Sequence, residues 1–217
     1  MIDRSEAEEH LRIIRSLMEK ATIYRAISAE AALIAGALSV VTATAGHWLA
    51  APPFDAPHDS FRFAVPWAAV FVVATGANLF LLRRDAQRRG ELVISQRMQL
   101  AIRGMLPALL GGALCVLLPT DGGWAATASL WVLFYGISLL AASHFAPKSI
   151  CWLGRAFFAA GTALAVGGGF LCDWWRGTNQ VWAAHLIMGG TFGLFHLAYA
   201  VCAWPRKKTG ALPPSEP

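Results

Sequence analysis

Six long apolar blocks divide this sequence, and they constrain its fold more than any other feature. Each block is close to the length of about 20 residues that a helix needs to cross the hydrocarbon core of a bilayer. Only helices and closed barrels satisfy every backbone polar group in lipid, so we predict an all-α integral membrane protein with six transmembrane helices. The blocks are Ala26–Leu49, Val65–Leu82, Met98–Leu118, Trp124–Phe145, Cys151–Cys172 and Val181–Trp204.

The composition agrees with a chain that is surrounded mainly by lipid. Charged residues make up 14% of the 217 residues and hydrophobic residues 56%, with a mean hydropathy of +0.50. Soluble domains contain about 25% charged residues, so this chain has too little polar surface to cover a water-soluble protein. Because the N-terminus is charged from its third residue, we expect the first block to act as an uncleaved anchor and not as a signal peptide.

The positions of the Lys and Arg residues predict the orientation. Sixteen of the 18 lie before or beside block one, around the connections between blocks two and three and blocks four and five, or after block six. Arg62 and Arg176 alone lie on the other side. Cytoplasmic loops carry the excess of Lys and Arg. We therefore expect a multi-pass protein of the bacterial inner (plasma) membrane, with its N- and C-termini both cytoplasmic.

The segments that flank the blocks are short. Residues 1–25 are predicted to form a cytoplasmic amphipathic helix, because Ser5 and Glu8 fit a capping box and Leu11 and Ile14 recur at helical spacing. The apolar stripe of this helix can lie on the membrane surface, pack under the bundle or pair with a partner helix. Residues 26–204 then form the transmembrane domain, and residues 205–217 are predicted to be a disordered cytoplasmic tail.

A Trp-Ala-Ala motif occurs three times, at Trp67, Trp124 and Trp182, with 57 and 58 residues between its starts. It opens blocks two, four and six, each at the point where the chain re-enters the membrane from the outer side. This spacing predicts three repeated helical hairpins, which bury their faces by packing on one another. The alternative is coincidence in a chain rich in Ala and Trp.

Runs of small residues predict close contact between helices, because lipid offers no hydrophobic driving force for helices to associate. Gly167–Gly169 in block five and Gly189–Gly190 in block six would let these two blocks approach backbone to backbone. Pro107 frees a carbonyl inside block three and is expected to bend it.

Ionisable side chains at membrane depth are the first candidates for a functional site. Glu30 lies about a turn and a half inside block one, near the depth of Arg25, Arg103 and Arg155 at the entries of blocks one, three and five. These four residues are the predicted substrate-binding residues of a polar pocket, open to the cytoplasm, for an anionic headgroup or a proton-coupled substrate. The alternative is a structural ion pair with arginines that extend to the interface.

The histidines suggest a second kind of site. His185 and His196 are eleven residues apart and share a face of an ideal helix. His47 and His144 end blocks one and four at corresponding depths. Two pairs at two depths would suit a carrier of two b-type haems, in which imidazoles are the axial ligands. The simpler account places the four histidines at the interface or in helix contacts, without a cofactor.

No enzyme motif occurs in the sequence. A nucleotide-binding loop, H-E-x-x-H and G-x-S-x-G are all missing. The cysteines are isolated, which is typical of small buried apolar residues and not of a metal site or a disulfide; they are Cys115, Cys151, Cys172 and Cys202. We therefore predict a protein that is not an enzyme, with no catalytic residue and no metal site.

The leading hypothesis is an integral membrane protein that handles a small solute or a lipid, or that serves as a membrane subunit of a larger assembly. One alternative is a docking or regulatory protein that recruits a cytoplasmic partner through its N-terminal helix. Another is a b-type haem electron-transfer subunit. The expected partners are membrane lipids, a cytoplasmic protein or other membrane subunits, and a second copy of the chain. Nucleic acid is not expected, because the orientation signal already explains the net charge of +5.

The stretch "LRIIRSLMEKATIYRAISAEAALIAG", Leu11 to Gly36, resembles the start of a family of uncharacterised six-span proteins of the bacterial inner membrane. The plan of three hairpins is also similar to small six-span membrane proteins of the acid-resistance type. The first resemblance covers 26 residues and the second concerns architecture alone. Neither implies an activity or a role for any residue.

Overall fold

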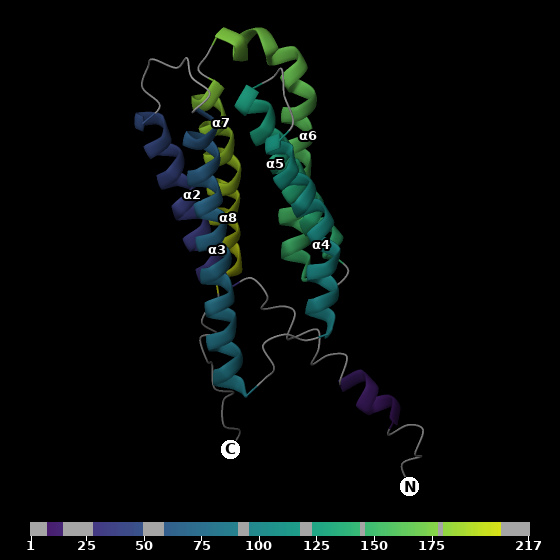
Figure 1. Cartoon of the computed structure of the whole chain (residues 1–217). Coiled ribbons are helices and arrows are strands. Elements are labelled where there is room, and N and C mark those ends of the chain that lie inside the picture. The colour runs from purple at the N-terminus through teal and green to yellow at the C-terminus, as the bar shows by residue number, and fades with distance from the viewer. Residues whose placement is uncertain are drawn as a thin grey trace, which may run out of the picture.

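The computed structural model shows helices and no strand in the ranges that it describes, which are residues 8–14, 28–49, 59–90, 96–117, 123–143, 146–177 and 180–204. Side chains are described there except at residues 47–49, 59–62, 89, 96–97 and 168–177. Figure 1 shows the arrangement of the helices. They are α2 (Ala29–Leu49), α3 (Asp59–Arg89), α4 (Gln96–Leu114), the turn η1 (Cys115–Leu117), α5 (Gly123–Ala141), α6 (Lys148–Gly177), α7 (Gln180–Met188), the π-helical turn η3 (Gly189–Gly193) and α8 (Leu194–Ala203).

Six stretches of these helices are long and apolar enough to cross a membrane, as the sequence predicts. The elements α7, η3 and α8 follow one another without a break and form the sixth stretch, called span six below. By length and composition the chain is therefore suited to be a multi-pass membrane protein. The stretches are Ala29–Gly46, Phe63–Arg88, Met98–Leu117, Gly123–Ala141, Lys148–Gly167 and Gln180–Ala203.

Two helices differ from the predicted blocks at their ends. The helix α2 begins at Ala29, and the Ser28 hydroxyl caps it by accepting a hydrogen bond of 3.0 Å from the backbone N–H of Ala31. The helix α3 has 31 residues and continues past Leu82 to Arg89, because charged side chains end an apolar block without ending a helix. Gly90, with a φ of 66°, ends α3 in the left-handed conformation that favours glycine.

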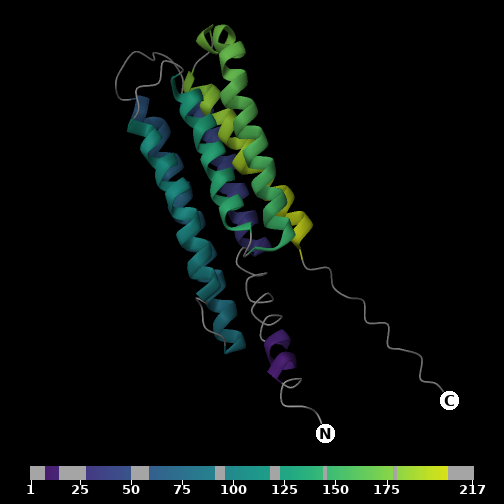
Figure 2. The same cartoon turned by 90° about the vertical axis from the view of Figure 1, so that its right-hand side faces the viewer.

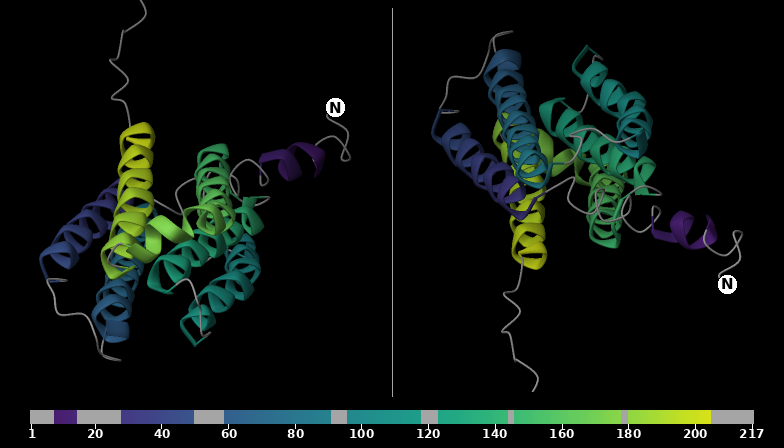
Figure 3. Two further views of the ribbon diagram at one scale, coloured as in Figure 1. Left: turned by 90° about the horizontal axis from the view of Figure 1, so that it is seen from above. Right: turned by 90° about the horizontal axis from the view of Figure 1, so that it is seen from below.

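The helices form two groups, visible from the side in Figure 1 and along the bundle axis in Figure 3. In the first helix group, α2 packs against α3 and against span six. In the second helix group, α5 packs against α4 and α6. The two groups meet where α5 and α6 contact span six. The buried core includes Phe63, Val132, Leu139 and Phe157, which come from both groups.

Within the second helix group, α5 and α6 approach each other backbone to backbone. A Cβ atom at Gly136 would collide with the backbone of Phe157 and Phe158, and one at Gly161 would collide with the backbone of Leu133. Glycine is therefore required at both positions for this close contact.

The first helix group uses glycine in the same way. A Cβ atom at Gly189 of span six would collide with Ala43 of α2, and one at Gly193 would collide with Val40. The expectation that Gly189 lets blocks five and six approach is therefore wrong, because Gly189 packs against the first span. The space that a Cβ would fill at Gly167 and at Gly190 has no described atom within 4 Å.

The predicted hairpins are only partly reflected in the contacts. The helix α2 packs on α3 and α4 packs on α5, as the first two hairpins require. In the third, α6 touches α7 and α8 but packs mainly on α5, and span six packs mainly on α2 and α5. The motif residues Trp124 and Trp182 lie in the first turns of α5 and α7, whereas Trp67 lies deeper in α3. The threefold repeat remains a prediction.

Several segments with sequence predictions lie partly or wholly outside the described residues. Residues 8–14, within the predicted N-terminal helix of residues 1–25, are helical and exposed. The remaining residues of that helix and the predicted tail at residues 205–217 lie outside the described ranges, as do Arg25 and His144. His47 lies in α2, but its side chain is not described.

Candidate functional site

One of the predicted substrate-binding residues, Glu30, forms an ion pair, and its partner lies on a helix that the sequence did not indicate. Glu30 lies in the first turn of α2, so it is closer to the membrane edge than the predicted turn and a half. Arg84 of α3 donates a hydrogen bond of 3.0 Å from Nη2 to Glu30 Oε2. The Glu30 side chain is 53% exposed and the Arg84 side chain is 37% exposed. An ion pair at this exposure contributes about 0–1 kcal/mol, so its main effect is to tie the end of α3 to α2.

The other predicted substrate-binding residues lie elsewhere in the bundle. Arg103 is exposed on α4, and Arg155 is exposed on α6, where its guanidinium carbon lies 5.1 Å from the centre of the Trp152 ring. Both helices belong to the second helix group, whereas Glu30 belongs to the first. The structure therefore brings Glu30 to Arg84 and does not pair it with Arg103 or Arg155.

His185 of α7 lies in a buried aromatic cluster, which we call the first aromatic cluster. Phe63 is at its centre, with ring centres 5.3 Å from His185, 5.4 Å from Trp124 and 5.6 Å from Trp131. Because Phe63 belongs to α3 and both tryptophans belong to α5, this cluster joins the two helix groups. The cluster consists of Phe63, Trp67, Trp124, Trp131 and His185.

The contacts of His185 determine its tautomer. The indole N–H of Trp67 donates a hydrogen bond of 3.1 Å to His185 Nδ1. An indole nitrogen can only donate, so Nδ1 carries no proton and a neutral ring holds its proton on Nε2. The ring edge lies so close to α2 that a Cβ atom at Gly46 would collide with three of its atoms. Trp67 and Gly46 therefore hold His185 between α3 and α2.

His196 of α8 lies in a second buried cluster, the second aromatic cluster. Tyr135 of α5 has its ring centre 5.7 Å from His196, and Phe157 of α6 has its ring centre 5.4 Å from it. This cluster also joins the two helix groups, because Phe192 and Phe195 of span six complete it. Its members are Tyr135, Phe157, Phe192, Phe195 and His196.

Both ring nitrogens of His196 have protein partners. Nδ1 lies 2.8 Å from the backbone carbonyl of Phe192, which can only accept, so Nδ1 donates. Nε2 lies 3.1 Å from the Tyr135 hydroxyl. In the neutral ring Nε2 then accepts the Tyr135 proton. This hydrogen bond crosses from the second helix group to the first.

The π-helical turn η3 changes the direction in which the two histidines point. A π turn contains one residue more than an α turn, and one residue corresponds to a rotation of about 100°. His185 precedes η3 in the chain and His196 follows it. Their side chains therefore no longer point from the same face of span six. His185 bonds to Trp67 of the first helix group and His196 bonds to Tyr135 of the second. The expectation of a shared face is therefore wrong.

These hydrogen bonds engage ring nitrogens that the haem alternative requires. An axial imidazole needs a free nitrogen lone pair. The lone pair of His185 Nδ1 is engaged by Trp67, and the two nitrogens of His196 are engaged by Tyr135 and Phe192. Haem ligation by either residue would require these contacts to rearrange. The contacts of His185 and His196 agree with the simpler account of helix-contact histidines, and the haem alternative remains a prediction.

Other polar groups in the spans are used locally. Ser39 and Thr191 each donate to the carbonyl four residues earlier in their own helix, over 2.8 Å and 2.7 Å. Among the described residues, no three His, Cys, Asp or Glu side chains come close enough together to hold a metal ion.

Sequence reasoning missed Trp67, Tyr135, Gly46 and Arg84 as site residues. Trp67 was recognised only as part of a repeated motif, although an indole N–H at membrane depth needs an acceptor. Tyr135 had a similar signal, because its hydroxyl falls in the middle of an apolar block. Gly46 and Arg84 gave no such signal in the sequence, since their roles depend on which helices become neighbours.

No known protein-family model, curated protein or solved structure matches this chain.

Proposed function

We propose that this chain is a multi-pass protein of the bacterial inner membrane, with both termini cytoplasmic, that handles a small solute or a lipid by relative movement of its two helix groups. The observation that carries this proposal is the difference between the contacts inside each group and the contacts between the groups. Each group would move as a unit, and the aromatic clusters would be the surfaces that rearrange.

The contacts inside each group include close glycine contacts. Gly136 and Gly161 hold α5 against α6, and Gly189 and Gly193 hold span six against α2, in each case without space for another carbon atom. Such close-packed interfaces do not deform continuously. By contrast, where α5 and α6 contact span six, no described glycine lies against a backbone atom of the other group. The contacts there include the aromatic clusters, buried alanines and the hydrogen bond from Tyr135 to His196. Side chains of this kind can repack without disturbing a backbone contact.

An unsatisfied donor also supports a second arrangement of the interface. The indole nitrogen of Trp131 is buried in the first aromatic cluster without a hydrogen-bond partner among the described residues. An unsatisfied buried donor costs about 1–3 kcal/mol. Movement that gave Trp131 a partner would recover this free energy, so two arrangements could be close in stability.

The predicted substrate-binding residues have a place in this proposal. Glu30 begins the first span, and Arg103 and Arg155 lie in the early turns of the third and fifth spans, at the same end of the bundle but on different groups. These charges are already exposed, so separation of the groups at this end would change the distance between the opposite charges that a solute or headgroup meets from the cytoplasm. Arg25 would contribute from the segment just before α2.

Distances between spin labels test the movement. Cysteines would replace four exposed residues, Val72, Leu110, Val166 and Val201, after the native cysteines are changed to serine. The pairs Val72–Leu110 and Val166–Val201 report across the two groups in lipid nanodiscs. The pairs Val72–Val201 and Leu110–Val166 lie within one group and are the matched controls.

We expect two distance populations for the pairs across the groups and one narrow population for the control pairs. A single narrow population for all four pairs would contradict the proposal. Broad distributions for all four pairs would also contradict it, because the groups would then not move as units.

One observation favours the docking alternative as a second candidate. Residues 8–14 form a helical segment on which Leu11, Ile13 and Ile14 are all exposed. Leu11 and Ile14 are three residues apart and share a face, which lipid or a partner helix can cover. If a cytoplasmic partner is recruited here, deleting residues 1–22 abolishes its co-purification and leaves the spin-label distances unchanged. The haem alternative is tested separately by the absorbance of the purified protein near the Soret band.

A further inference from the structure

The end of α3 is placed to meet the headgroups of the membrane. With 31 residues, α3 is about 46 Å long at about 1.5 Å per residue, whereas a hydrocarbon core is about 30 Å thick. Figures 1 and 2 show that its C-terminal end extends past the corresponding ends of α2 and α8. The excess length must therefore lie in the headgroup layer or beyond it.

The side chains on this end change from apolar to basic within one turn. Phe80 is 67% exposed, and Arg83 is the first charged residue after it. If the hydrocarbon core ends near Leu82, residues 83–89 cover about the next 10 Å. The headgroup layer of one leaflet is about 5–7 Å thick. The guanidinium groups of Arg83, Arg84 and Arg88 therefore lie at the depth of the lipid phosphates.

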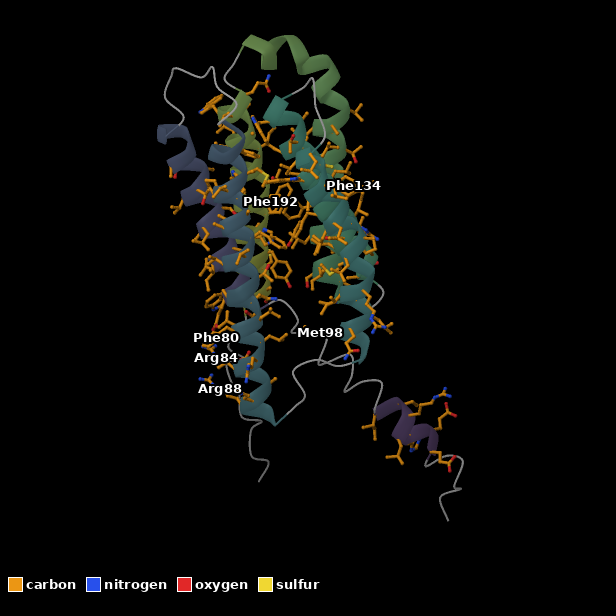
Figure 4. The ribbon with its side chains drawn as sticks, in the orientation of Figure 1. Phe80, Arg84, Arg88, Met98, Phe134 and Phe192 are labelled. Atoms are coloured by element: carbon orange, nitrogen blue, oxygen red, sulfur yellow. The ribbon has the colours of Figure 1, made fainter. Side chains whose placement is uncertain are left out.

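The arginines at this end of α3 lie on two faces of the helix, and Leu79 and Arg83, four residues apart, share one of them. Phe80, Arg84 and Arg88 follow one another at intervals of one turn along one face of α3 (Figure 4). Arg84 forms an ion pair with Glu30 of α2 over 3.0 Å, and its Nε lies 3.7 Å from the carboxylate of Asp85. Its charge is thus already balanced by carboxylates, whereas Arg83 and Arg88 are exposed. Arg83 and Arg88 are therefore the arginines of this end that remain available to a lipid phosphate.

We propose that this basic end of α3 binds the headgroups of anionic phospholipids, with one phosphate on Arg83 above Leu79 and another on Arg88 above Phe80. Arginine suits this role because its planar guanidinium can donate two parallel hydrogen bonds to a phosphate. Leu79 is 49% exposed and continues the apolar surface below Phe80. This site rests on the membrane placement proposed above and does not require the two groups to move.

The test compares lipid retention by purified variants. Protein reconstituted with mixed phosphatidylglycerol and phosphatidylethanolamine is returned to detergent, and the lipids that remain bound are counted by native mass spectrometry. The variant is Arg83→Gln with Arg88→Gln. The matched control is Arg12→Gln with Lys148→Gln, which removes the same charge from two other exposed positions. Thermal unfolding confirms that both are folded.

We expect the wild type to retain phosphatidylglycerol selectively and excess inorganic phosphate not to displace it. Arg83→Gln with Arg88→Gln should weaken this retention at least about tenfold, since a hydrogen bond to a charged group contributes about 1.5–3 kcal/mol and a tenfold loss corresponds to about 1.4 kcal/mol. The control should weaken it less than about twofold, because neither of its positions is in the α3 site.

Equal losses in the variant and the control would overturn the proposal, because total charge alone would then explain binding. No loss in either would also overturn it, as would displacement by inorganic phosphate. If the glutamine variant does not fold, Arg83→Lys with Arg88→Lys keeps the charge but removes the paired donors, and it should still reduce retention severalfold. Unchanged retention in a folded lysine variant would then contradict the arginine site.

Discussion

At the scale of single residues, the contact between Gly46 and His185 is sensitive to substitution. Gly46→Ala adds a carbon atom where the His185 ring lies, so the ring must move and its hydrogen bond with Trp67 weakens. We expect a loss of about 1–3 kcal/mol in the free energy of unfolding, measured by denaturation in mixed micelles.

The matched control for this prediction is Gly76→Ala in α3. No described atom lies within 4 Å of the added carbon at this position. Alanine is favoured over glycine inside a helix by about 0.5–1 kcal/mol, so Gly76→Ala should leave stability unchanged or raise it. Equal effects of the two substitutions would show that Gly46 does not pack on His185 as described.

Tyr135 provides the second prediction at this scale. Tyr135→Phe removes the hydroxyl that bonds to His196 and keeps the ring in the second aromatic cluster. Hydrogen bonds between membrane helices contribute about 0.6 kcal/mol on average and about 1.7 at most. A double-mutant cycle of Tyr135→Phe with His196→Phe should therefore give a coupling free energy of unfolding in this range. A coupling of zero would contradict the hydrogen bond.

At the scale of elements, the π turn η3 sets the direction of α8. Deleting Gly190, which has open space beside it, should convert η3 into an α turn and rotate α8 by about 100° relative to α7. His196 would then leave Tyr135, and the coupling measured in the double-mutant cycle should disappear.

Substitution at the same position provides the control for the deletion. Gly190→Ala keeps the number of residues in the turn, so the coupling between Tyr135 and His196 should persist. If the coupling survives the deletion as well, the direction of α8 does not depend on the π turn.

At the scale of the whole molecule, the distribution of basic residues predicts that both termini are cytoplasmic. Green fluorescent protein fused after Pro217 should fluoresce, because it folds in the cytoplasm. Alkaline phosphatase fused after Asp121, which follows three spans, should be active on the outer side. The reverse pattern of the two reporters would contradict the orientation and, with it, the assignment of the basic end of α3 to the inner leaflet.

The number of spans could be predicted from the sequence, but their neighbours could not. Each span is marked locally by about 20 apolar residues, and the described residues contain six such helical stretches. The partner of Glu30 depends on α2 lying beside α3, which no local pattern records. The π turn could not be predicted either, because the residues Gly189–Gly193 are equally compatible with an α turn and a π turn. His185 and His196 were identified as candidates, whereas their partners Trp67 and Tyr135 become apparent only in three dimensions.

The tight contact between α2 and span six has a consequence for biosynthesis. The helix α2 is synthesised well before span six, on which it packs closely, so its glycine-lined face lacks this neighbour until span six has been inserted. An insertase or a temporary helix contact must shield that face in the meantime. Chains that stop before residue 180 would keep it uncovered, and this exposed groove is a signal by which membrane proteases could recognise unfinished copies.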